Sequence, residues 1–223
     1  TEYTISLFGL TLNNESVSVK VNGFPPHFYI QIPENWKKYH IEEMVEEIKR
    51  KFSFKSKTYG KSVLRYMVTK KKIFKGFTNN KFYPFVRILF RNKKTMDMCS
   101  KLFLDKNNRP KKFKIENLRD SIYGRKFPVF ETNIDPMLRF MHTREIQPAN
   151  FIRIEKNKYE ISNPSETHCQ MEIKAKWSNI SGVPSEDISK LIVLSYDIEA
   201  DSSHGDFPVA KKKYKKLATN VVD

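Results

Sequence analysis

Strand and helix signals alternate in a fixed order from residue 27 to residue 131, and this order limits the folds that the chain can adopt. Residues 27–32, 62–70 and 82–90 are rich in aromatic and β-branched side chains, which is typical of strands. Residues 41–52 and 94–104 instead repeat apolar side chains at helical spacing, which predicts two amphipathic helices. The first of these helices is expected to be acidic at its start and basic at its end.

A closing strand is expected after the second helix. Residues 113–116, Phe-Lys-Ile-Glu, are the preferred candidate, and residues 127–131, Phe-Pro-Val-Phe-Glu, are the alternative. The resulting order of strand, helix, strand, strand, helix and strand is that of the ferredoxin-like or RRM-like βαββαβ unit. The sequence therefore predicts an α+β fold that contains such a unit.

Short strands are also expected on both sides of this unit. Residues 3–21 alternate apolar and polar side chains around a turn at residues 13–15, which indicates a β-hairpin. Residues 151–154 and 170–177 indicate two more strands. We expect these strands to pair with the hairpin in an OB-like β-barrel, in which the RRM-like unit is an insertion.

Two carboxylates follow an apolar run, after a turn-rich linker predicted at residues 178–189. The run from Leu191 to Leu194 indicates a strand that is buried on both faces. Because side chains alternate along a strand, Asp197 and Glu199 are predicted on the same face, about 6.6 Å apart along the strand. Two such oxygen ligands suit Mg²⁺ or Mn²⁺. The simpler alternative is a solvent-exposed strand end without a metal.

The charge of the chain favours a polyanionic partner. The 41 Lys and Arg residues exceed the 25 Asp and Glu residues, which gives a formal net charge of +16. Nucleic acid is favoured over a membrane surface, because no amphipathic basic helix or lipid-attachment motif accompanies the charge. A basic surface without a partner is the alternative. The candidate nucleic-acid contacts are Lys70, Lys71, Lys72, Arg91, Lys93, Lys94, Lys111 and Lys112.

Two aromatic segments partly match the base-stacking segment of an RNA-binding RRM. They are Phe74-Lys-Gly-Phe77 and Tyr83-Pro-Phe-Val-Arg87, and the proline at position 84 is foreign to the RRM pattern. We expect these aromatic side chains to pack in the core rather than to stack on bases. A further basic run at residues 211–216 matches either a nuclear-import patch or a surface that faces DNA.

Three segments resemble family B DNA polymerases, and they occur in the order in which that family has them. They are Gly23–Ile32, with Pro-Pro-His-Phe-Tyr-Ile; Glu131–Met141, with Asn-Ile-Asp and Arg-Phe-Met; and Tyr196–Pro208, with Asp-Ile-Glu and Gly-Asp-Phe-Pro. Together they span nearly the whole chain. The resemblance is greatest to delta-like members from giant nucleocytoplasmic viruses, mimivirus-like ones above all.

The resemblance implies that Asp-Ile-Glu is the first motif of a 3′–5′ proofreading exonuclease. Asp197 and Glu199 would then be catalytic ligands of a two-metal centre. In the family the remaining carboxylates come from later motifs, and no matching segment occurs before Asp223, so an incomplete site is expected. Asp201 and Asp206 are interpreted as loop residues. Mg²⁺ or Mn²⁺ is expected in the complete parent enzyme, and no bound cofactor is expected in this fragment.

The implied protein is the amino-terminal fragment of a replicative DNA-directed DNA polymerase. Its expected domains are a discontinuous OB-like barrel at residues 1–26 and 142–189, an RRM-like insertion at residues 27–141, and the start of an RNase H-like exonuclease domain at residues 190–223. DNA, as template and primer or as single strands, and the rest of the polymerase chain are the expected partners. The fragment alone is expected to be inactive. The alternative is a free-standing OB- or RRM-type nucleic-acid-binding protein without catalysis.

Other classes of protein are disfavoured. The two cysteines, Cys99 and Cys169, do not build a disulfide framework. No apolar run approaches the ~18 residues of a membrane span, and the first residues do not resemble a signal peptide. We therefore expect an intracellular protein in a reducing compartment, with the host cytoplasm favoured over the nucleus. The five histidines lack metal-site spacing, and the seven glycines form no phosphate-binding loop.

Overall fold

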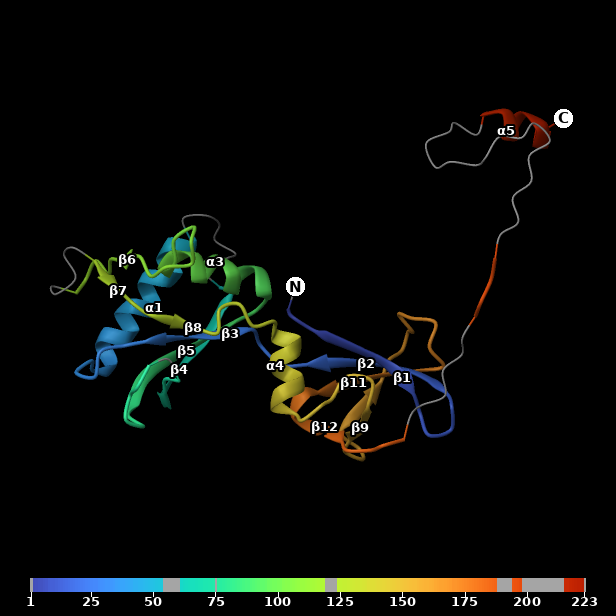
Figure 1. Ribbon diagram of the computed structural model, residues 1–223, viewed down its shortest axis with the longest axis horizontal. Helices are drawn as coiled ribbons and strands as arrows, with labels where there is room; N and C mark the ends of the chain where they lie inside the picture. Colours follow the sequence, from blue (N-terminus) through green and yellow to red (C-terminus); the bar gives the residue numbers. More distant parts are fainter. Residues whose placement is uncertain are drawn as a thin grey trace. The chain divides into compact units, whose positions relative to one another are not determined.

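The computed structural model describes residues 2–53, 61–74, 76–118, 124–187, 194–197 and 215–222. The chain divides into two compact units, Thr1–Ile188 and Ser189–Asp223. The described strands all belong to the first unit, and the second contains helix α5, Lys215–Val222 (Figure 1). The first unit combines helices with β-sheets, which confirms the predicted α+β class. Among the described residues, no helix combines the length and the apolar composition of a membrane span.

An antiparallel sheet with two helices on one face forms the first core of this unit (Figure 1). Its strands, in the spatial order β4-β5-β3-β8, are Val63–Lys72, Phe82–Phe90, His27–Gln31 and Val129–Phe130. The helices are α1, Lys38–Ser53, and α3, Lys93–Phe103. Phe28 of β3 and Ile88 of β5 lie in one buried cluster with Met44 of α1 and Phe103 of α3. The elements predicted between residues 27 and 104 are thus confirmed.

The two helices differ in how they begin. Helix α1 begins at Lys38, so no acidic residue lies in its first turn, and the predicted acidic start is wrong. Its basic end is confirmed by Arg50 and Lys51 in the last turn. Helix α3 begins after Asn92, whose side-chain oxygen accepts a 2.9 Å hydrogen bond from the backbone N–H of Thr95. Such a cap satisfies one of the free donors at a helix start.

The preferred closing strand is wrong, and the alternative is correct. Residue Phe130 of β8 pairs with Tyr29 of β3. Strand β6, Lys112–Phe113, instead pairs with β7, Arg125–Lys126, in a separate two-stranded sheet. The physical reason lies in the ring of Phe113, which stacks on Phe103 of α3 with centroids 4.6 Å apart. Residues 112–113 thus contribute their apolar side chain to the helix layer and not to the main sheet.

The second core lies between the first hairpin and the strands near residue 170. The hairpin strands β1 and β2 are Ile5–Leu10 and Ser16–Asn22, and the later strands β9 to β12 are Phe151–Ile154, Tyr159–Ile161, Met171–Lys176 and Ile180–Val183. One sheet has the order β1-β2-β11-β10, with β2 and β11 parallel, and the second pairs β12 with β9. Val19, Val21, Ile173 and Ile180 belong to the shared buried cluster.

This second core corrects two predictions. Pairing of residues 170–177 with the hairpin is confirmed, but residues 151–154 pair with β12 and not with the hairpin. The predicted linker at residues 178–189 is wrong for residues 178–183, because a 3-10 turn, Trp177–Asn179, leads directly into β12. Gly182 permits this strand to approach the backbone of Glu145 closely, since a Cβ atom at residue 182 would lie only 2.6 Å from the carbonyl carbon of Glu145.

Helix α4, Pro136–Thr143, connects the two cores. Asp135 caps it by accepting a 2.8 Å hydrogen bond from the N–H of Met137, and Pro136 occupies the first turn, where its missing N–H costs nothing. Phe140 is fully buried in the second core, with its ring centroid 5.7 Å from that of Phe24. The segment Glu131–Met141 therefore anchors the chain to the second core as it leaves β8.

Candidate nucleic-acid interface

The segment that contains Asp197 does not form the expected buried strand in its described part. Residues Leu194–Asp197 have no regular secondary structure, and Leu194 and Tyr196 are 80% and 78% exposed. A strand must pair its backbone N–H and C=O groups, and none of the described strands pairs with this segment. Glu199 lies outside the described residues, as do Asp201, Asp206 and residues 211–214.

The structure therefore does not test whether Asp197 and Glu199 share one face. Among the residues that the structure describes, no group of three or more His, Cys, Asp or Glu side chains is placed to hold a metal ion. The metal prediction thus depends on the chemistry of the two carboxylates and not on observed geometry. Carboxylate oxygens are the ligands that Mg²⁺ and Mn²⁺ prefer.

The predicted basic contacts form three separate groups and not one cluster. Lys70, Lys71 and Lys72 end β4, next to the start of β5. Arg91, Lys93 and Lys94 lie beyond the opposite end of β5. The eight residue steps from one end of β5 to the other correspond to about 27 Å of extended strand, which separates the two groups. Lys111 and Lys112 belong to the segment of β6. One straight stretch of nucleic acid would therefore contact these groups at different points along its length.

Lysines at the end of β4 alternate between two faces of the strand. Lys71 lies on the same face as Tyr29, and its Nζ atom is 4.2 Å from the centroid of that ring. Lys72 lies on the other face, 5.2 Å from the centroid of Phe82, and donates a 3.4 Å hydrogen bond to Asn80 Oδ1. Lys70 is exposed. Lys70 and Lys72 are thus the exposed members of this group, and Lys71 is half-buried beside Tyr29.

The second group surrounds the start of α3. Lys93 donates to Asp97 at 2.9 Å, an ion pair of the helix surface, while Arg91 and Lys94 are exposed. Lysines in the first turn of a helix are unfavourable beside the positive end of the helix dipole. The local potential is consequently positive, which attracts phosphate.

Residues 48–96 carry the whole net charge of the chain. This stretch contains 16 Lys and Arg residues and no Asp or Glu, whereas the rest of the chain is balanced. The charge asymmetry therefore lies in one continuous stretch of the chain, which includes the end of α1, β4, β5 and the start of α3, and a basic stretch of this kind is typical of a nucleic-acid-binding protein.

On the face of the β4-β5-β3-β8 sheet opposite the two helices, the aromatic rings at the centre are buried. Tyr29 and Phe85 are only 6% and 2% exposed, and Arg139 of α4 lies over the Tyr29 ring. Burial of His27 lowers the pKa of its imidazole to about 4, and the positive charge of Arg139 adds to this effect. The expected core packing of Phe85 is confirmed. A flat base cannot reach these rings in this structure.

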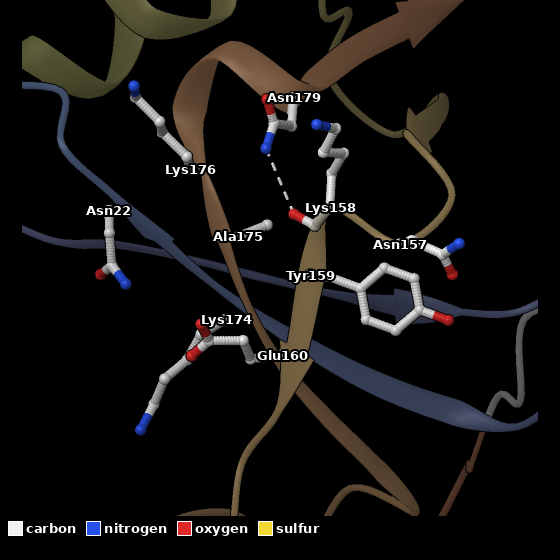
Figure 2. Close-up of a pocket in the computed structure, with 9 residues that line it drawn as sticks. All are labelled: Asn22, Asn157, Lys158, Tyr159, Glu160, Lys174, Ala175, Lys176 and Asn179. Atoms are coloured by element: carbon white, nitrogen blue, oxygen red, sulfur yellow. Dashed lines mark hydrogen bonds between the residues drawn. The ribbon is translucent and has the colours of Figure 1, made fainter.

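A polar hollow of about 370 Å³ lies on the second core (Figure 2). Its walls come from β2, β10, β11 and the turn after β11, and they are Asn22, Asn157, Lys158, Tyr159, Glu160, Lys174, Ala175, Lys176 and Asn179. Asn179 donates a 3.2 Å hydrogen bond to the carbonyl oxygen of Lys158, which fixes one wall. Sequence reasoning did not predict this hollow, because its walls come from segments far apart in the sequence.

Comparison with known proteins relates the chain to one family. The model of the DNA polymerase family B, exonuclease domain, matches residues 127–216, which include Asp197 and Glu199. A DNA polymerase of Phaeocystis pouchetii virus is 34% identical over 100% of this chain and 21% of its own length. A DNA polymerase of Acanthamoeba polyphaga mimivirus is 29% identical over 97% of this chain and 12% of its own length.

More distant relatives agree. The DNA polymerase delta catalytic subunit of Dictyostelium discoideum is 26% identical over 98% of this chain and 20% of its own length. The family B DNA polymerase of the archaeon Pyrobaculum calidifontis shares the fold with a TM-score of 0.52 and 13% identity, over 85% of this chain and 21% of that protein. The chain thus spans about a fifth or less of the length of these relatives. The resemblance predicted from the sequence is confirmed.

Proposed function

We propose that this chain, which matches viral family B DNA polymerases over its whole length, works as the amino-terminal region of a replicative DNA polymerase. The observation that carries the proposal is the agreement between the full-length match and the exonuclease-domain match over residues 127–216. The alternative of a free-standing nucleic-acid-binding protein receives no support from these comparisons.

The proposed domain arrangement is an RRM-like unit inserted in an OB-like barrel. The strand order β4-β5-β3-β8, with α1 and α3 on one face, supports the ferredoxin-like arrangement of the first part. The hairpin and the strands after residue 150 share one core, which supports a discontinuous barrel. Because Phe140 packs in that core, we place the end of the insertion before α4 and not at residue 141.

In the complete enzyme, we propose that Asp197 and Glu199 hold Mg²⁺ or Mn²⁺ together with carboxylates from other segments. Such metal ions supply charge stabilisation for the attacking and leaving oxygens of a phosphodiester. The role of this chain is then to provide two hard oxygen ligands close together in sequence. The expected exonuclease substrate is a single-stranded DNA 3′ end.

The proposed partners are template and primer DNA and the remaining domains of the polymerase. The net charge supports DNA as a partner, because a +16 chain with its surplus in residues 48–96 attracts phosphate. We place this activity in the host cytoplasm. The proposal includes no membrane partner and no small-molecule cofactor.

The proposal is tested on the longer protein that contains this chain. With Mg²⁺, that protein is expected to extend a primer on a matched template and to excise a mismatched 3′ nucleotide, and chelation of Mg²⁺ should stop both reactions. A longer protein that binds DNA but neither extends nor excises under these conditions would contradict the assignment as a polymerase.

A further inference from the structure

Two phenylalanines at the tip of the β4–β5 hairpin are almost completely exposed. Phe74 is 99% exposed and Phe77 is 96% exposed, although aromatic side chains are usually buried. The predicted core packing of these two residues is therefore wrong. Each ring leaves a large apolar surface in water, which the fold itself does not use. Two exposed aromatic side chains three residues apart in sequence indicate a binding surface.

Two hydrogen bonds connect described residues near these rings. The hydroxyl of Thr78 donates a 3.2 Å hydrogen bond to the carbonyl oxygen of Ile73, which connects residues on either side of both phenylalanines. The N–H of Lys81 donates to the carbonyl oxygen of Thr78 at 2.9 Å. Gly76 adopts a φ of 81°, a conformation that glycine reaches without strain. The rings thus lie in a turn whose flanking residues are hydrogen-bonded.

Positive charge surrounds this turn. Lys70 and Lys72 are exposed at the end of β4, and Lys72 lies beside the ring of Phe82, which is itself 55% exposed. Lys81 is partly neutralised, because its Nζ atom lies 2.7 Å from Glu34 Oε1. No acidic residue occurs anywhere in residues 48–96. The tip therefore combines aromatic faces with exposed lysines on the strand that leads to it.

We infer that the tip of the β4–β5 hairpin binds single-stranded DNA, with Phe74 and Phe77 stacked on bases and Lys70 and Lys72 in contact with phosphates. Aromatic stacking platforms beside a basic track are the usual means of binding single strands without sequence preference. Base faces are free in a single strand but already stacked in a duplex, so the rings favour the single strand. This inference rests on the proposed function and deepens it, because it assigns part of the DNA binding to named residues.

Lys70 and Lys72 occupy alternate positions at the end of β4, on the strand that leads into the tip. A linear track of charge matches a linear polyanion, whereas insertion of the tip into a membrane would use the rings and leave the track unused. Phe74 and Phe77 make the contact independent of sequence, since every base has a π-face. The expected ligand is thus a single strand of any sequence.

The test measures binding of a labelled oligothymidylate of about 16 nucleotides to the 223-residue chain by fluorescence anisotropy. The double variant Phe74→Ala, Phe77→Ala is expected to bind roughly tenfold or more weakly, with the same dependence on salt. The double variant Lys70→Gln, Lys72→Gln should instead reduce the slope of log affinity against log salt by about 1.4, which is about 0.7 for each lysine replaced.

Phe8→Ala is the matched control, because Phe8 is 68% exposed on β1 and lies outside the basic stretch. Its affinity for the oligonucleotide should equal that of the unsubstituted chain. The variant Phe74→Trp, Phe77→Trp should keep the affinity, and its tryptophan emission should be quenched by the bound strand. Because the two rings contact little of the protein, the thermal unfolding of all these variants should remain unchanged.

Unchanged affinity of the Phe74→Ala, Phe77→Ala variant would overturn the inference, as would tighter binding of duplex than of single strand. Stronger binding to vesicles of anionic lipid than to the oligonucleotide would assign the tip to a membrane and would also overturn it. None of these results affects the assignment as a polymerase, which primer extension by the longer protein tests separately.

Discussion

The guanidinium of Arg139 holds Glu131 at both its side chain and its backbone. Nη1 donates a 2.6 Å hydrogen bond to Glu131 Oε2, and Nη2 donates a 3.0 Å hydrogen bond to the Glu131 carbonyl oxygen. Glu131 adopts a φ of 62°, a left-handed conformation that costs a non-glycine residue about 1–2 kcal/mol. Arg139 thus fixes the turn that follows β8 and directs α4 toward the second core. Both residues belong to the segment that resembles family B polymerases.

Replacement of Arg139 by alanine should destabilise the chain. Arg139 is only 9% exposed and makes charge-assisted hydrogen bonds, so its loss should lower the free energy of unfolding by about 2 kcal/mol and the melting temperature by about 4–8 °C. Arg153→Ala, which removes an exposed arginine of β9, is the control and should change the free energy of unfolding by less than about 0.5 kcal/mol. Equal melting temperatures for the two variants would contradict this role of Arg139.

Gly182→Ala should be more disruptive than its size suggests. The added Cβ would meet the Glu145 carbonyl group and lie 3.0 Å from the Cα of Ile146, and both neighbours are backbone atoms that cannot move aside. We expect a loss of about 2 kcal/mol or more in urea denaturation, with an unchanged m-value. Gly9→Ala in β1, whose Cβ would meet nothing within 4 Å, is the matched control. If both substitutions were tolerated equally, the close approach of β12 to residue 145 would be incorrect.

The carboxylate of Glu172 should make stability depend on pH. It accepts hydrogen bonds from the N–H of Glu166 at 2.8 Å, from the N–H of Thr167 and from the hydroxyl of Ser165 at 2.9 Å, and these bonds lower its pKa to about 2. A pKa lower in the folded than in the unfolded state stabilises the fold above the unfolded pKa, and this stabilisation disappears as pH falls through the folded value.

Comparison with Glu172→Gln isolates this contribution. The difference in free energy of unfolding between the two proteins should be constant above pH 4.5 and should shrink between pH 4.5 and about 2. Urea denaturation at a series of pH values measures it, with Glu160→Gln on the exposed edge strand β10 as the control. A difference that grew as the pH fell would have the wrong sign for this set of hydrogen bonds.

The 223-residue chain by itself should have neither polymerase nor 3′–5′ exonuclease activity. Within its described residues no cluster of carboxylates is placed to hold a metal ion, and a two-metal reaction needs several such ligands. A labelled primer incubated with the purified chain and Mg²⁺ should remain intact. Degradation that requires metal and disappears in Asp197→Ala would show that the chain holds a complete site.

The elements predicted correctly are those whose own residues carry a periodic signal. Strands β3 and β5 and helices α1 and α3 are five or more residues long, and each shows its buried face in the sequence. Strand β8 has two residues and β12 has four, which is too short for a period to appear. Their place depends on distant partners, β3 for β8 and β9 for β12, that local sequence does not specify.

The candidate nucleic-acid interface was also predicted only in part from the sequence. Charge and residue type correctly indicated which stretch is basic, but Lys72 and Arg91 lie at opposite ends of the β4–β5 pair, which only the register of the strands reveals. Phe74 and Phe77 were expected in the core because they are aromatic. Their exposure follows from the position of the turn beyond the last strand pair, Lys72 with Phe82. The apolar run from Leu191 to Leu194 predicted a strand, and its described residue Leu194 pairs with none of the described strands.

Mismatch excision by the longer protein tests the central claim most directly. In the double variant Asp197→Ala, Glu199→Ala, excision of a mismatched 3′ nucleotide should fall by about a thousandfold or more, because metal charge stabilisation of several kcal/mol is lost. Extension of a matched primer should continue at the unsubstituted rate, and Asp201→Ala should leave both reactions unchanged. Excision that survives the double substitution would contradict the assignment of Asp197 and Glu199 as metal ligands of a proofreading exonuclease.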